Sequence, residues 1–158
     1  MQSNWQLTGI DHQPFERLFD LSDAQLAEHG AVRRIADANA GFPCRISLID
    51  AAAGEELLLL PFEHHPAASP YRASGPIFVR RGAQRRRLAP RDVPPYVTTR
   101  LISVRAYDAA AMMVDAAVCE GTAVAQELDR LFGDPAVRYV HLHNARRGCF
   151  SCAVTRVP

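Results

Sequence analysis

VRYVHLHNARRGCFSCAVTRV (residues 137–157) is the stretch of sequence that decides the fold. Its two arms, 137–145 and 149–157, are rich in the β-branched and aromatic residues that strands favour. The RRG turn between them, 146–148, is far too short for the crossover that parallel strands require. The stretch therefore predicts an antiparallel β-hairpin at this end of the sequence.

Further strands are indicated upstream of this hairpin. The run TRLISVRAYD alternates polar and apolar residues, and MMVDAAV is a candidate partner for it. CRISLID and ELLLLPF, separated by the turn AAAGE, read as another hairpin, and PIFVRR reads as one more strand. The ranges of these predicted strands are 99–108, 112–118, 44–50, 56–62 and 76–81.

Two helices are also indicated. Ser22 and Gln25 form a capping-box pattern and Gly30 a stop signal, which predicts a short helix over 23–29. TAVAQELDRLFG (122–133) predicts a second helix, with Thr122 as its cap. We expect residues 1–158 to form a single α+β domain, mainly an antiparallel sheet of hairpins with two or three short helices.

The composition excludes several classes of protein. Of the 158 residues, 48% are hydrophobic and 22% charged, values typical of a globular protein. The longest apolar run is far shorter than a membrane span, and the N-terminal residues do not resemble a secretory signal, so we expect a cytoplasmic protein with no membrane partner. All 18 basic residues are arginine. The absence of lysine excludes lysine Schiff-base chemistry and the phosphate-binding lysine of a P-loop.

Arginines are concentrated in RRGAQRRRLAPR (80–91). No aromatic residue within this run could stack on bases, and the net charge of +1 creates no global field for nucleic acid. We therefore interpret the run as a solvated loop and do not expect a nucleic-acid partner. An arginine-bound phosphate or carboxylate remains the alternative.

HLHNARRGCFSC (141–152) combines two histidines with two cysteines, the ingredients of a zinc site, a redox pair or a thiol active site. His141 and His143 share one face of a strand, but Cys149 and Cys152 are three residues apart and face opposite ways on a regular strand. A second CxxC pair is absent, and no helix is indicated after this one. We therefore expect no structural zinc, no redox CxxC and no bound cofactor.

A second polar cluster is predicted where the first hairpin begins and ends. The segments PCR (43–45) and FEHHP (62–66) lie at the end of that hairpin farthest from its turn. Cys44 could therefore approach His64 or His65, the minimum for a thiolate–imidazole pair. The alternative is a cysteine packed as a small hydrophobe beside surface histidines.

Ordered motifs from about residue 40 to residue 157 resemble a known family. The segments GFPCRISL, LLLLPFEH, SPYRASGPIFVR, LISVRAYDA, MMVDA and VRYVHLHNARRGC are similar to the small bacterial proteins grouped as domain of unknown function 1203. The resemblance implies membership of that family but no activity. It covers Cys44, Arg45, Glu63, His64, Tyr71, Phe78, Asp108, Asp115, His143, Asn144 and Cys149. Cys119 and Cys152 are not part of the pattern, which argues against a CxxC site.

We consider first that the chain binds a small anionic ligand in a cleft lined by arginine, histidine, tyrosine and cysteine. The predicted ligand-binding residues are Arg45, Tyr71, Arg72, Asn144, Arg147 and Cys149. An alternative is a thiol-dependent enzyme with Cys44 as nucleophile, His64 as base and His143 positioning the substrate. A further alternative is a zinc-binding protein that uses His64, His141, His143 and a cysteine.

Overall fold

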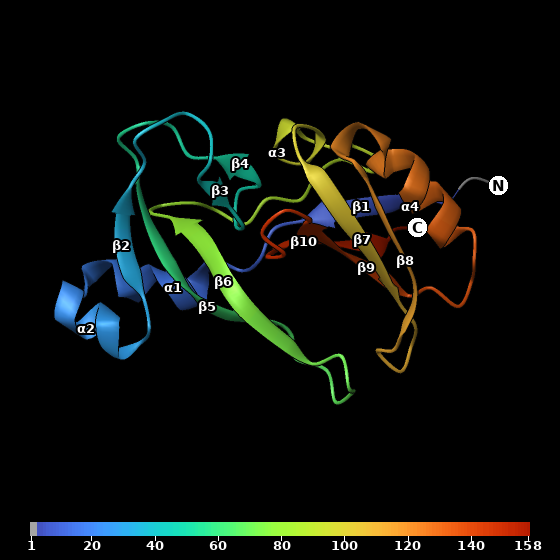
Figure 1. The fold of residues 1–158 in the computed structure, drawn as a ribbon, viewed down its shortest axis with the longest axis horizontal. Helices are drawn as coiled ribbons and strands as arrows, with labels where there is room; N and C mark the ends of the chain where they lie inside the picture. The colour runs from blue at the N-terminus through green and yellow to red at the C-terminus, as the bar shows by residue number, and fades with distance from the viewer. Residues whose placement is uncertain (1–2) are drawn as a thin grey trace.

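Two five-stranded sheets lie side by side in the computed structural model, which describes residues 3–158 (Figure 1). Sheet A has the strand order β1-β10-β9-β7-β8, and sheet B has the order β2-β5-β6-β3-β4. The strands are β1 Trp5–Thr8, β2 Val32–Ile35, β3 Pro43–Cys44, β4 Ile49–Asp50, β5 Glu56–His65, β6 Ala73–Arg80, β7 Leu101–Tyr107, β8 Met113–Glu120, β9 Tyr139–Asn144 and β10 Phe150–Arg156. The helices are α1 Gln13–Glu16, the 3-10 turn η1 Arg17–Asp20, α2 Asp23–Glu28, α3 Pro95–Thr98, the 3-10 turn η2 Gly121–Ala123 and α4 Val124–Phe132. The α+β class is confirmed, with four α-helices in the described chain instead of two or three.

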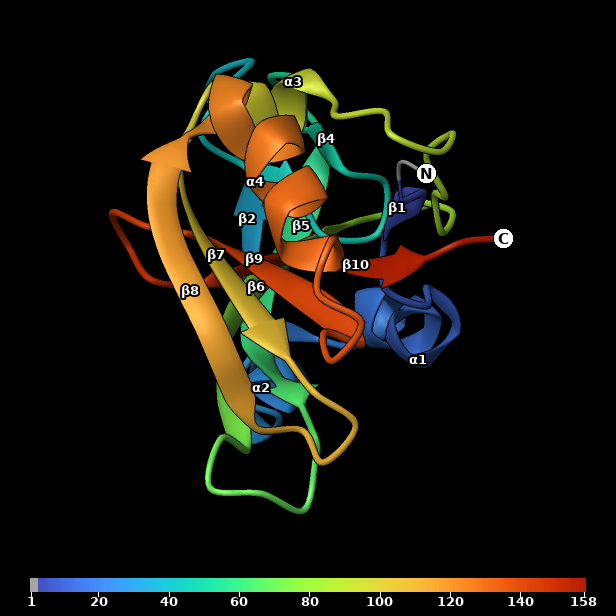
Figure 2. The same cartoon turned by 90° about the vertical axis from the view of Figure 1, so that its right-hand side faces the viewer.

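Sheet A contains the two hairpins that the alternation best predicts. β9 pairs with β10, and β7 pairs with β8, each in antiparallel register. Helix α4 covers one face of this sheet (Figure 2) and buries its apolar stripe of Val124, Leu128, Leu131 and Phe132 there. The predicted Thr122 cap is wrong: residues 121–123 form η2, and α4 begins at Val124 without a side-chain cap.

A β-bulge in β10 decides which side of sheet A each of its residues faces. Phe150 lies opposite His143, whereas Cys152 lies opposite Leu142, so Ser151 is the extra residue. Strict alternation would place Phe150 and Cys152 on the same face. The bulge instead directs Phe150 away from the core under α4 and leaves Cys152 inside it.

Sheet B is not built from the predicted first hairpin. Residues 44–50 do not form one strand: β3 and β4 are two-residue strands that pair with each other across a turn over 45–48. Leu48 adopts φ 54° and its N–H bonds to the Cys44 carbonyl, closing that turn. Strand β5 pairs with β2 and β6 instead, and Cys44 pairs in parallel with Phe78 of β6. All of residues 43–48 are buried, which a half-exposed hairpin strand does not allow.

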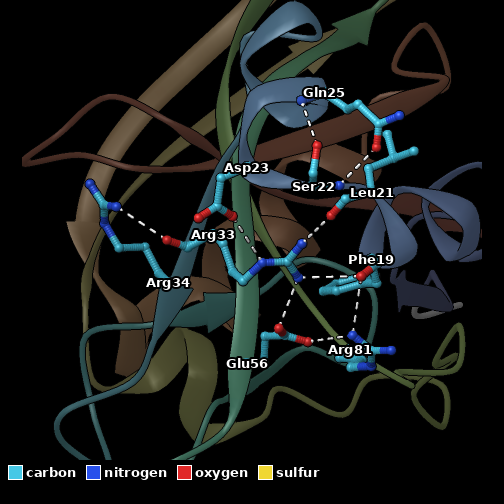
Figure 3. A network of polar contacts seen from close by, with 9 residues as sticks. All are labelled: Phe19, Leu21, Ser22, Asp23, Gln25, Arg33, Arg34, Glu56 and Arg81. Atoms are coloured by element: carbon cyan, nitrogen blue, oxygen red, sulfur yellow. Dashed lines mark hydrogen bonds and ion pairs between the residues drawn. The ribbon is translucent and has the colours of Figure 1, made fainter.

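Polar contacts attach the N-terminal helices to sheet B (Figure 3). Glu56 accepts hydrogen bonds from Arg33 at 2.8 Å and Arg81 at 2.7 Å, and both guanidinium groups also reach the Phe19 carbonyl. The hydrogen bond from Arg81, followed by that from Arg33, lowers the pKa of Glu56 below its ordinary value. The capping box at the start of α2 is present as predicted. These contacts hold η1 and the start of α2 against sheet B.

The two sheets have separate hydrophobic cores, and this arrangement leaves polar residues between them. One core lies between sheet A and α4, and another lies between sheet B and the N-terminal helices. Because alternate residues of β7 and β9 point into the first core, the remaining ones face sheet B. These are Ser103, Arg105, Tyr107, Tyr139, His141 and His143. Among residues 3–158, no helix has the length and apolar character needed to cross a membrane.

Candidate functional site

A cleft of about 540 Å³ lies between the two sheets. Its walls come from β3, the middle of β5 and β6, the start of β7 and the turn between β9 and β10. The basic lining residues are Arg45, Arg100, Arg146 and Arg147. The apolar lining residues include Pro43, Leu59, Pro76, Ile77, Phe78 and Leu101. The cleft thus combines an apolar lining with a group of guanidinium donors.

Arg45 connects the two sheets at the base of this cleft. Its side chain is 1% exposed and donates to the carbonyl of Phe150 on β10 and to that of Pro43 on β3, both at 2.8 Å. Its third bond runs to the Cys149 sulfur at 3.0 Å. No carboxylate of the described chain pairs with it. A buried cation therefore lines the cleft without an acidic partner, which is rare because buried charges are normally paired.

Cys149 and Asn144 flank this guanidinium at the two ends of the β9–β10 turn. Both residues are partly exposed and line the cleft. The Asn144 amide donates to the Cys149 sulfur over a long 4.0 Å, and its carbonyl oxygen is buried with no hydrogen-bond partner in the described structure. The sulfur thus has N–H donors from the turn after β3 and from the end of β9.

Arg146 and Arg147 are held at the mouth of the cleft by the shape of the turn. Gly148 has φ +82°, a left-handed conformation that glycine adopts without strain, and its N–H closes the turn on the Asn144 carbonyl at 2.7 Å. Both arginine side chains are exposed, and neither forms a hydrogen bond or ion pair with another residue in 3–158. They are therefore available to a ligand.

Sequence reasoning missed three charged residues that line the cleft, Arg100, Arg146 and Glu120. Arg146 is adjacent to the predicted Arg147, and the RR pair was the signal that could have found it. Arg100 is already paired with Asp50 at 2.9 Å. Nothing in the sequence indicated Glu120, which reaches the cleft because β8 pairs with β7.

Four histidines cluster beside the cleft, also between the sheets. His64 and His65 come from the end of β5, and His141 and His143 come from β9. The His64 ring lies 5.0 Å from that of His143 and stacks on Phe150 at 5.2 Å, and the His65 ring lies 5.3 Å from that of His141. The predicted shared face of His141 and His143 is confirmed.

Burial favours the neutral form of His64, His141 and His143. Burial, followed by the charges of neighbouring histidines, lowers the pKa of His141 from 6.5 to about 3. Burial also lowers the pKa of His143 to about 4, against the opposing effect of its bond to the Gly148 carbonyl. Burial first and His65 second lower the pKa of His64. Ring nitrogens of His64, His141 and His143 are buried without a hydrogen-bond partner in the described structure.

The arrangement does not favour the zinc alternative. Within residues 3–158, no three side chains of the His, Cys, Asp or Glu types are placed to hold a metal ion together. All four cysteines lie in this range and are free thiols. Cys152 belongs to the core under α4, where burial raises the pKa of its thiol to about 12.

The structure does not bring Cys44 and His64 together. Cys44 is completely buried in the core of sheet B, and its sulfur accepts the backbone N–H of Arg80. Along β5, His64 is five residues beyond Leu59, the residue level with Cys44, or roughly 16 Å away at about 3.3 Å per residue. The predicted thiolate–imidazole pair depended on the first hairpin, which does not form.

Tyr71 and Arg72 also lie outside the cleft. Both are exposed in the connection between β5 and β6, where Arg72 makes a two-pronged ion pair with Glu63 at 3.0 and 3.2 Å. Of the predicted ligand-binding residues, those that line the cleft are therefore Arg45, Asn144, Arg147 and Cys149.

The arginine run 80–91 is used largely within the chain. Arg81 pairs with Glu56, Arg85 donates to the Gly9 carbonyl, and Arg91 forms a two-pronged pair with Asp129. Several of its guanidinium groups are therefore already occupied by intramolecular partners.

Comparison with known proteins agrees with the resemblance seen in the sequence motifs. No curated protein and no solved structure matches the chain. One family model, described as Protein of unknown function (DUF1203), matches residues 41–156 and so includes every residue that lines the cleft. The chain therefore belongs to the DUF1203 family.

Proposed function

We propose that the protein binds a small ligand that carries an anionic group and an apolar part, in the cleft between the two sheets. The observation that carries the proposal is the buried Arg45, which lines the cleft without an acidic partner in the described chain. An anion in the cleft would supply the charge that this guanidinium lacks.

The rest of the lining supports the same ligand chemistry. Arg146 and Arg147 extend the positive charge to the cleft mouth. Asn144 adds a side-chain amide that can both donate and accept hydrogen bonds. Leu59, Phe78 and other apolar residues supply the apolar part of the lining. A volume of about 540 Å³ falls within the range of small-molecule sites.

The test is a titration with phenyl phosphate, a probe that combines a dianion with an apolar ring. We expect saturable chemical-shift changes in amide NMR spectra at residues 144–149 and on the facing β6. Arg147→Gln removes one charge-assisted bond at an exposed position and should weaken binding about tenfold.

Arg72→Gln is the matched control, because it removes an exposed arginine from outside the cleft. It should leave the affinity for phenyl phosphate unchanged. Equal weakening by both substitutions, or equal binding of the aromatic cation benzylamine, would contradict an anion site in this cleft.

A further inference from the structure

Cys149 is the one thiol of the described chain that lines the cleft. Cys44 and Cys152 are completely buried, and Cys119 lies on β8 and packs partly against the core under α4. A solute in the cleft therefore meets the Cys149 sulfur and no other.

The surroundings of this sulfur place it in a site suited to an anionic ligand. Its nearest polar partner is the Arg45 guanidinium, which donates a hydrogen bond to the sulfur at 3.0 Å. Arg45 in turn is buried with no carboxylate partner among residues 3–158, so the site is built to hold negative charge. Arg146 and Arg147 stand beside the same opening.

We propose that Cys149 is a site of thiol–disulfide exchange with anionic low-molecular-weight disulfides, which the arginines of the cleft select. This inference rests on the proposed function, since the same guanidinium groups bind the carboxylates of the disulfide. It replaces the predicted nucleophile Cys44 with a thiol that a solute can reach.

The incoming disulfide is itself the oxidant, and it also supplies the leaving group. The Cys149 thiolate attacks one sulfur of the incoming disulfide, whose S–S bond breaks as the new one to Cys149 forms. The electron pair of the broken bond leaves with the second half of the reagent, which becomes a thiol on taking up the proton that Cys149 released. Cys149 is oxidised to a mixed disulfide, and half of the reagent is reduced.

The test compares two disulfides of equal length and opposite charge, the dianion 3,3′-dithiodipropionate and the dication cystamine. Reduced protein at pH 7 is treated with each, and mass spectrometry of peptides follows the modification of Cys149 and Cys119 over time. We expect the dianion to modify Cys149 at least about tenfold faster than the dication, as electrostatic selection in a charged cleft produces. Cys119 is the internal control: Glu127 and Glu120 lie near it, so it should show no preference for the dianion.

The double variant Arg146→Gln/Arg147→Gln should abolish the preference at Cys149, and because both side chains are exposed it should fold normally. Phenyl phosphate should slow the modification of Cys149 but not of Cys119. Equal rates with the two reagents, or faster modification of Cys119 by the dianion, would overturn the inference. If phenyl phosphate binds as proposed but Cys149 shows no preference, the exchange fails while the anion site stands; if phenyl phosphate does not bind, both fail.

Discussion

The buried histidines predict that the fold loses stability between pH 7 and pH 5. In the unfolded chain a histidine titrates near 6.5, whereas the folded structure lowers the pKa of His141 to about 3 and that of His143 to about 4. Below pH 6.5 the unfolded state therefore binds more protons than the folded state. The stability that these neutral histidines confer is complete above that pH and is lost as the pH falls towards their folded values.

The size of the stability loss follows from how far the pH lies below the pKa of histidine in the unfolded chain. At pH 5, about 1.5 below the unfolded pKa, protonation of the unfolded state costs about 2 kcal/mol for each of the two histidines, or about 4 kcal/mol together. His64 adds to the loss in the same direction. The ion-paired carboxylates Glu56 and Asp115 have lowered pKa values, so their stabilising effect persists until the pH is more acidic still. The interval from pH 7 to pH 5 therefore reports mainly on histidine.

The assay is urea denaturation at pH 7 and pH 5 for the wild type, His141→Phe and the control His29→Phe. Phenylalanine suits the buried site of His141, which packs against Phe150 at a ring distance of 5.1 Å, and it cannot be protonated. We expect His141→Phe to reduce the loss between the two pH values by about 2 kcal/mol. His29 is exposed, so its substitution should leave the loss unchanged. A wild-type loss below about 1 kcal/mol, or identical losses in all three proteins, would refute the reasoning.

Three further substitutions, one of them with Gly75→Ala as its control, test the stability of the fold. Arg45→Met leaves two carbonyl groups without their donor and should cost about 3 kcal/mol in urea denaturation; an unchanged free energy of unfolding would show that Arg45 does not connect the sheets. Gly9→Ala places a Cβ on the Ile46 carbonyl oxygen and should cost more than about 4 kcal/mol, whereas Gly75→Ala enters open space and should change the thermal midpoint little. Ser22→Ala removes the capping box and should cost about 1 kcal/mol, a prediction contradicted if its stability equals that of the wild type.

Local patterns predicted most of sheet A. Alternation over 99–108 and the short turn at 146–148 each involve residues close in sequence, and hairpins between such neighbours form as expected. Sheet B was less predictable, because β5 has neighbours on both sides and residues 43–48 are buried without alternating. No local signal marks Leu48 as a left-handed residue, and that conformation turns the chain where a continuous strand was expected.

Local patterns predicted only part of the candidate site. Asn144, Arg147 and Cys149 share one tight turn, so their proximity follows from the hairpin. The hypothesis that pairs Cys44 with His64 followed from the wrong strand pairing. Arg100 and Glu120 enter the cleft through the placement of β7 and β8 against sheet B, which no spacing in the sequence encodes.

The sequence by itself determined the class of the fold, the terminal hairpin, the capped helix α2, the absence of lysine chemistry and the resemblance to the DUF1203 family. These features depend on composition or on residues a few positions apart, where propensity and periodicity act directly. Only the tertiary structure decided where a ligand could bind. Arg45 bonds to Phe150, 105 residues away, and the cleft exists because this contact holds two sheets with separate cores against each other. Such a long-range contact depends on how whole elements pack, and local patterns carry no information about it.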